Sequence, residues 1–195
     1  MLKLEGKKIG EWNEFCQNLK KKYPPVSEAP RVDNNPIEPY YFIEKLIECF
    51  KDDEVIVGGN GTAFFLPFQV GKVKENQRYI WNSGDASMGY DLPAAIGACF
   101  ANGCKRTICL AGDGSIMMNL QELQTLKHYN LPIKLFVLNN NGYISIQQTQ
   151  KNFFQGRMTA CTKDSGVSIP DFMKVGNAFG LKTIKIDKLE NLEEQ

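Results

Sequence analysis

Apolar residues from position 39 onward alternate between short continuous runs and helical spacing. The continuous runs are typical of buried strands. We expect strands at 54–57, 78–81, 106–111, 133–138 and 181–186. Between them, apolar positions that recur every three or four residues predict helices at 40–50, 93–98, 115–129 and 171–179. This alternation predicts an α/β fold with a mostly parallel sheet flanked by helices on both faces. In such a sheet, ligands bind outside the carboxyl ends of the strands.

The beginning of the chain follows a different pattern. Apolar side chains at i, i+3, i+4 and i+7 within 12–19 predict a short amphipathic helix. The proline-rich segment 23–30 cannot continue this helix and indicates an extended linker. We therefore expect a helical remnant of a preceding domain plus linker at 1–38, and a main domain at 39–195.

Composition and charge exclude several function classes. The 195 residues include 23 basic and 22 acidic side chains, which gives a net charge of +1 at pH 7. No basic cluster is interleaved with aromatic residues, and no apolar run is long enough to span a bilayer, so we expect no nucleic-acid or membrane partner. The six cysteines form no C-x-x-C pair and no secretion signal begins the chain. We expect reduced thiols and a cytoplasmic location.

The strongest chemical signal directly follows a predicted strand. Gly112, Asp113, Gly114 and Ser115 lead from this strand into the next predicted helix. The two glycines permit a tight turn and a close approach of the backbone to a ligand. Ser115 is placed as the N-cap of the helix, where free amide groups can bind an anion. A carboxylate would repel a phosphate at this position, so Asp113 predicts a divalent cation between the two.

A second polar run follows the next strand. Asn139, Asn140 and Asn141 precede Gly142, and consecutive strands of a βαβ unit usually lie side by side, which places this run close to Asp113. One carboxylate with neutral oxygens suits Mg2+ that is shared with a diphosphate. Each run alone is also typical of an ordinary turn. Together, at neighbouring strand ends, they favour a metal–diphosphate site.

These two runs resemble the signature of thiamine-diphosphate enzymes, in their C-terminal diphosphate-binding (PP) domain. The segment 88–98 strengthens the resemblance, because it is similar to the Met-Gly-x-Gly-Leu-Pro-Ala-Ala-Ile-Gly-Ala run of acetolactate synthase-like members. The resemblance covers residues 39–186. It implies the thiamine-diphosphate-binding fold, with thiamine diphosphate and Mg2+ as cofactors.

The resemblance also implies roles for individual residues. Mg2+ would be coordinated by the side chains of Asp113 and Asn140 and by the backbone carbonyl of Gly142. Met88 would support the bend of the cofactor, and the Ala86 carbonyl would face its aminopyrimidine ring. The implied cofactor-binding residues are Asn60, Gly61, Thr62, Ala86, Met88, Gly112, Asp113, Gly114, Ser115, Asn140, Gly142, Tyr143 and Ile144.

For activity, the resemblance implies a transferase or lyase that decarboxylates a 2-oxo acid such as pyruvate and joins the product to an acceptor. The activating glutamate of such enzymes comes from a pyrimidine-binding domain of the same or another subunit. We therefore expect no catalytic residue in this chain, no activity of the isolated domain, and a homodimer or larger homo-oligomer. The family domain continues with a further helix and strand, so we expect the fold to be truncated at the C-terminus.

Three departures from the family pattern bear on the substrate. Asp91 stands where the family run has glycine, Gly61 stands where histidine is common, and 144–150 lacks the Gln-Trp pair of acetolactate synthases. They leave acetolactate formation open. The alternatives are a domain of another thiamine-diphosphate 2-oxo acid decarboxylase or lyase, and a non-catalytic relic of the fold.

Overall fold

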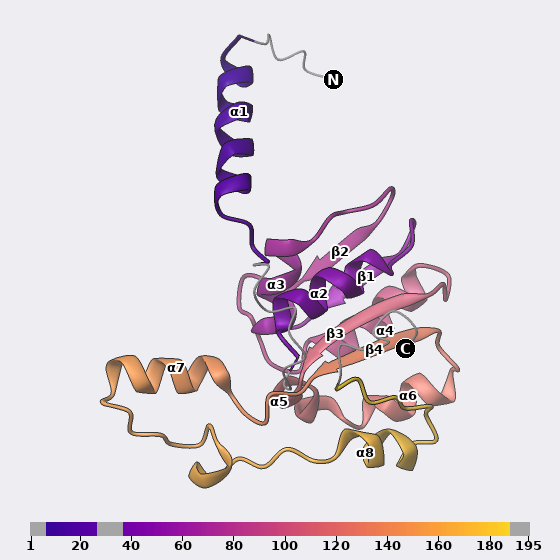
Figure 1. The fold of residues 1–195 in the computed structure, drawn as a ribbon. Helices are drawn as coiled ribbons and strands as arrows, with labels where there is room; N and C mark the ends of the chain where they lie inside the picture. The colour runs from indigo at the N-terminus through magenta and orange to yellow at the C-terminus, as the bar shows by residue number, and fades with distance from the viewer. Residues whose placement is uncertain (1–6, 27–36, 188–195) are drawn as a thin grey trace.

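The computed structural model describes residues 7–26 and 37–187, and Figure 1 shows their arrangement. The helices are α1 (Lys7–Lys22), α2 (Pro39–Glu48), α3 (Thr62–Val70), α4 (Asp91–Ala101), α5 (Asp113–Ile116), α6 (Glu122–His128), α7 (Ile144–Phe153) and α8 (Phe172–Ala178). The strands are β1 (Val55–Gly58), β2 (Arg78–Trp81), β3 (Thr107–Gly112) and β4 (Ile133–Leu138). Short 3₁₀ turns η2 (Met117–Asn119) and η3 (Lys163–Ser165) complete the described elements.

In the described part of the chain, the strands form one sheet in the order β2-β1-β3-β4, and every pair in it is parallel. β3 lies in the interior, between β1 and β4. Gly112 at the end of β3 is in register with Leu138 at the end of β4. The carboxyl ends of these two strands therefore meet at the same edge, and the predicted α/β fold is confirmed.

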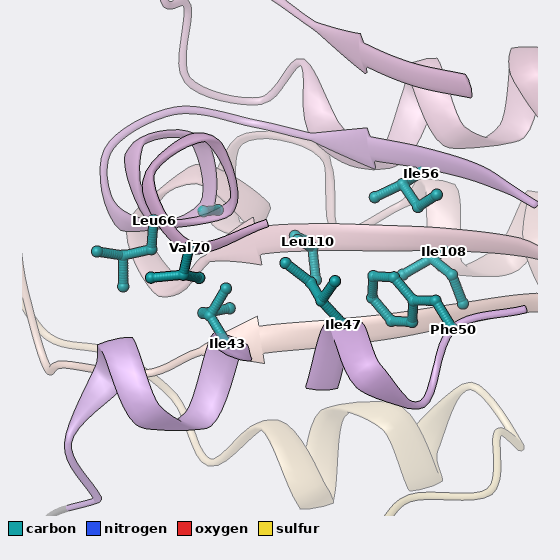
Figure 2. Close-up of a cluster of buried hydrophobic side chains, with 9 residues drawn as sticks. Ile43, Ile47, Phe50, Ile56, Leu66, Val70, Ile108 and Leu110 are labelled. Atoms are coloured by element: carbon teal, nitrogen blue, oxygen red, sulfur yellow. The ribbon is translucent and has the colours of Figure 1, made fainter. Parts of the chain in front are cut away.

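Side chains along each strand alternate between the two faces of the sheet. On one face, Ile56, Ile108 and Leu110 pack against apolar side chains of α2 and α3, as Figure 2 shows. On the other face, Cys109 packs against α4 and Ala111 belongs to a cluster with α4, α6 and α8. Helices thus cover both faces, as the pattern predicts. The carboxyl ends of the strands are therefore supported by a buried core on each face of the sheet.

The amphipathic helix expected near the N-terminus is confirmed as α1. Trp12 and Phe15 stack with ring centroids 5.6 Å apart and stay more than half exposed. Residues 27–36 of the expected linker, and the end of the chain from 188 on, lie outside the described residues, so the division at residue 38 stays a prediction. Within the described residues, no helix combines the length and hydropathy that a bilayer span requires.

Two helices and one segment differ from the sequence prediction. α3 and α7 were not predicted, because α3 is apolar nearly all round and contains Pro67, whereas α7 is mostly polar and buries no residue. The segment 181–186, predicted as a strand, is irregular in the structure. Leu181 packs with the α8 cluster instead, and Ile184 is 54% exposed.

The single helix predicted at 115–129 is divided in the structure. It begins two residues earlier, as α5, tightens into η2 and resumes as α6. The 3₁₀ turn forms where the Asn119 side chain donates to the Gly89 carbonyl at 2.6 Å. The division of the helix thus coincides with a tertiary contact that the periodicity does not encode.

Candidate functional site

Asp113 directly follows β3 and is only 2% exposed. Its Oδ1 accepts a hydrogen bond from the backbone N–H of Gly114 at 2.7 Å. Its Oδ2 accepts from the backbone N–H groups of Asn140 at 3.1 Å and Gly142 at 3.2 Å. The loop between β4 and α7 is therefore folded around a buried carboxylate.

The structure brings Asp113 and Asn140 together through the backbone amide of Asn140. Charge-assisted hydrogen bonds of this kind offset the cost of burying a carboxylate. Asn141, between the two donors, has a left-handed φ of 62°, which asparagine tolerates better than most residues. The asparagine run thus supplies the backbone turn that lets two amides reach one oxygen.

The residues at this edge fit the ligand requirements of Mg2+. A carboxylate oxygen accepts two bonds and Oδ1 of Asp113 accepts one, so it keeps a lone pair for a cation. The Asn140 side chain is exposed and has no hydrogen-bond partner within the described residues, whereas Asn139 accepts from the N–H of Asn141 at 3.1 Å. No three His, Cys, Asp or Glu side chains cluster in the described ranges. A cation here would thus depend on one carboxylate, neutral oxygens and the phosphate oxygens of its ligand.

Three of the predicted cofactor residues meet beside Asp113. A Cβ added to Gly114 would lie 2.2 Å from Cε1 of Tyr143 and 3.2 Å from Cε of Met88. Met88 and Tyr143 are both half-buried. The segment that follows β2 and the loop that follows β4 therefore converge on the turn after β3, and this close approach requires glycine at position 114.

Other predicted residues line the end of β1. The Asn60 side chain donates to the Ala86 carbonyl at 3.0 Å, which ties the loop after β1 to the segment after β2. Gly61 is the N-cap of α3 with a left-handed φ of 56°, and Thr62 begins the helix. The Ala86 carbonyl, which the resemblance directs at the cofactor, keeps one lone pair beyond this hydrogen bond.

Gly112 and Ile144 are two further predicted residues, and they are the sequence neighbours of Asp113 and Tyr143. Gly112 is the N-cap of α5 and has extended backbone angles, so the chain turns from strand to helix directly after it. Ile144 begins α7 next to Tyr143 and is 38% exposed. The predicted cofactor residues therefore lie at the carboxyl end of β3 or on the segments that follow the strands at this edge of the sheet.

Ser115 is not the N-cap that the sequence predicts, because Gly112 holds that position, whereas its predicted contact with the cofactor stays a prediction. The Ser115 side chain is 2% exposed. Its hydroxyl donates to Oδ2 of Asp91 and accepts from the N–H of Gly89 at 2.8 Å. The hydroxyl donates its one proton to Asp91 and cannot donate to a ligand at the same time. Ser115 can therefore donate to an anion only through its backbone N–H.

Asp91 is a buried acid that the sequence analysis did not assign to the site. It begins α4, has no exposed surface, and accepts from the N–H of Leu92 through Oδ1 at 2.9 Å. Burial raises the pKa of this carboxyl, and the hydrogen bonds from Ser115 and Leu92 oppose the rise. The sequence does show that Asp91 stands where the family run has glycine, which marks the position as unusual. It does not show that Ser115 is the hydrogen-bond partner of Asp91.

The segment that follows α7 returns to the loop around Asp113. The Cys161 carbonyl accepts from the N–H of Tyr143 at 3.0 Å and from the Gln147 side chain at 2.9 Å. Cys161 itself is fully buried. These contacts tie the segment after α7 to the loop, and no sequence motif indicates them.

Replacing Gly142 with alanine is expected to lower the free energy of unfolding by about 1–3 kcal/mol. Gly142 has a φ of 151°, and an added Cβ would lie 2.6 Å from the Cys161 carbonyl oxygen, which is backbone and cannot rotate away. Urea unfolding measured by circular dichroism tests this. As a matched control, Gly97→Ala in α4 meets no atom within 4 Å and should raise stability by about 0.5–1 kcal/mol. Equal stabilities of the two variants would contradict the packing described for this loop.

Comparison with known proteins gives a family match. Residues 59–195 match the model of the thiamine pyrophosphate enzyme, C-terminal TPP binding domain. The chain is 34% identical over 200 residues to the acetolactate synthase large subunit of Buchnera aphidicola, an alignment that covers 100% of this chain and 34% of that protein. It is 29% identical over 185 residues to acetolactate synthase isozyme 1 large subunit of Escherichia coli, covering 94% of this chain and 32% of that protein.

A third relative is the acetolactate synthase 1, chloroplastic, of Zea mays. It is 30% identical over 184 residues, which cover 92% of this chain and 28% of that protein. The chain thus spans about a third of the length of the curated relatives it matches.

Proposed function

Since the chain belongs to the thiamine pyrophosphate enzymes, as a C-terminal TPP-binding domain similar to that of acetolactate synthases, we propose that it binds thiamine diphosphate through Mg2+ at the carboxyl ends of β3 and β4. The observation that carries this proposal is the buried Asp113 carboxylate, around which the β4–α7 loop is folded. The Asp113 and Asn140 side chains and the Gly142 carbonyl would hold the cation.

Thiamine diphosphate, when bound, supplies an electron sink for cleavage of the bond next to a 2-oxo acid carbonyl. The residues of this chain bind and orient it. Gly114 leaves room for Met88 and Tyr143 to approach the turn after β3, and their side chains would offer an apolar support. Asn60 fixes the Ala86 carbonyl at the end of β1, where it would accept from the amino group of the cofactor.

We further propose that the whole protein acts on a 2-oxo acid such as pyruvate, with decarboxylation followed by carboligation. The similarity to proteins named acetolactate synthases supports this. The proton chemistry on the pyrimidine ring needs a carboxylic acid, and we assign it to a pyrimidine-binding domain of the same or another subunit in a homo-oligomer. The 195-residue chain alone is then expected to bind the cofactor without turning over substrate.

Titration calorimetry of the 195-residue chain with thiamine diphosphate tests the proposal. Binding is expected in the presence of Mg2+ and should weaken at least ~10-fold when the cation is removed with EDTA, because the diphosphate then meets the Asp113 carboxylate without a bridging charge. Thiamine without its diphosphate is the matched ligand control. Absence of binding at millimolar cofactor with Mg2+, or equal binding of thiamine, would overturn the assignment, and pyruvate turnover by this chain alone would refute its dependence on another domain.

A further inference from the structure

Asp91 lies where three segments around the candidate site meet. It begins α4, yet no part of it is exposed. Gly59, just after β1, passes so close that an added Cβ would lie 2.4 Å from Oδ2 of Asp91. Ser115, from the turn after β3, donates its hydroxyl to the same oxygen. Asp91 is therefore fully enclosed between the ends of β1 and β3.

The Ser115 hydroxyl connects Asp91 to Gly89. A backbone N–H can only donate, so Oγ of Ser115 accepts from Gly89 at 2.8 Å while its own proton goes to Asp91. The Gly89 carbonyl accepts from the Asn119 side chain at 2.6 Å. Both polar backbone groups of Gly89 are thus held by the chain that follows β3.

The two carboxyl oxygens of Asp91 have different partners. Oδ1 accepts from the N–H of Leu92 in the first turn of α4, which is a local helix contact. Oδ2 accepts from Ser115 and takes no part in that contact. A role confined to the start of α4 would require the first hydrogen bond and would leave the second unexplained.

We propose that Asp91 is a positioning residue for thiamine diphosphate, which acts by orienting the Ser115 hydroxyl so that Gly89, and with it Met88, is fixed against Gly114. This inference rests on the proposed function and deepens it. Gly89 has a left-handed φ of 81°, and an added Cβ would lie 2.7 Å from Cβ of Met118, so its place against η2 is narrowly defined. Without the Ser115 hydrogen bond, the peptide group between Met88 and Gly89 is no longer held. Met88, the predicted cofactor contact, would then lose its fixed position.

The test compares four variants of the 195-residue chain: Asp91→Leu, Asp91→Asn, Ser115→Ala, and Asp91→Leu with Ser115→Ala. Asp91→Leu keeps the branched shape of the side chain but removes both acceptor oxygens, whereas Asp91→Asn keeps one of them. Asp52→Leu is the matched control, since Asp52 is exposed and precedes β1 at the opposite edge of the sheet. Two quantities are measured: the amide hydrogen exchange of Gly89 by NMR without cofactor, and the Kd of thiamine diphosphate with Mg2+ by calorimetry.

Asp91→Leu is expected to raise the Kd about 10-fold, as removal of a residue that supports a ligand-contacting group does, and to accelerate exchange of the Gly89 amide. Ser115→Ala should give the same two effects, the double variant should be no worse than either, and Asp52→Leu should resemble the wild type. Asp91→Asn has one acceptor oxygen for the two donors Ser115 and Leu92, so its effects should lie between those of the wild type and Asp91→Leu. If Asp91→Leu does not fold, Ser115→Ala decides the question by the same readouts.

Unchanged Gly89 exchange in Asp91→Leu and Ser115→Ala, or losses of affinity that multiply in the double variant, would overturn the inference. Faster Gly89 exchange with an unchanged Kd would also overturn it, because Asp91 would then stabilise the turn without positioning the cofactor. A wild-type chain that binds no thiamine diphosphate would instead overturn the proposed function, and this outcome is recognised before any variant is made.

Discussion

Asp113→Ala is expected to weaken Mg2+-dependent binding of thiamine diphosphate by at least ~100-fold, since it removes the one charged ligand and the support of the loop around it. Asp113 is 2% exposed and accepts three backbone hydrogen bonds. Without it, the amides of Asn140 and Gly142 lose their shared acceptor, so the loop that carries the remaining cation ligands is no longer held. Titration calorimetry at saturating Mg2+ measures the effect.

Two further variants distinguish loss of the cation site from loss of stability. Asp113→Asn keeps an oxygen that can accept from the loop amides but loses the acceptor for the Gly114 N–H and the negative charge, so it should be more stable than Asp113→Ala and should still lose most of the cofactor affinity. Asp85→Ala removes an exposed carboxylate from the segment after β2 at the same edge, and it should bind as the wild type does. An Asp113→Ala chain with wild-type affinity would show that the cation is held elsewhere.

Ile108→Ala is expected to lower the free energy of unfolding by about 2–5 kcal/mol, which is the usual cost of such a cavity in a packed core. Ile108 is fully buried on β3, which is paired with a strand on each side, and packs in the cluster with α2 and α3 (Figure 2). The surrounding sheet and helices leave little freedom to close the space. Urea unfolding followed by circular dichroism gives the change directly.

A graded series serves as the control for this prediction. Ile108→Val removes one methylene and should cost about 0.5–1.5 kcal/mol. Ile184→Ala changes a side chain that is 54% exposed, and its effect should stay within about 0.5 kcal/mol. If Ile108→Ala and Ile184→Ala destabilise the chain equally, β3 does not lie at the centre of the core as the structure has it.

Much of the sheet was predictable because its strands are short apolar runs with a turn at each end. The segment 133–138 was expected as a strand and is β4 with the same bounds. Helices without an apolar stripe escaped prediction: α3 is apolar on most sides and α7 is polar on most sides, so neither shows the helical period. The expected strand at 181–186 failed because its apolar residues pack on α8 or stay exposed rather than joining the sheet.

In the candidate site too, one contact was predictable from the sequence and another was not. The meeting of Asp113 with the asparagine run was predictable, because successive parallel strands bring their carboxyl ends to one edge. The partner of Ser115 was not, because Asp91 and Gly89 reach it through the packing of α4 against β3. The role of the hydroxyl therefore depends on tertiary structure, and local motif rules assigned it to a helix cap.

The strand order β2-β1-β3-β4 also sets when the binding edge can assemble during folding. Val55 of β1 pairs with Thr107 of β3. The chain between these two strands, from α3 through α4, forms the loop that closes when they pair, and closing a long loop costs conformational entropy. Asp113 then gains two of its three amide donors only after β4 has docked beside β3. A nascent chain that stops before β4 has the motif at 112–115 but not the two donors from the β4–α7 loop that hold its carboxylate, so we expect it not to bind the cofactor.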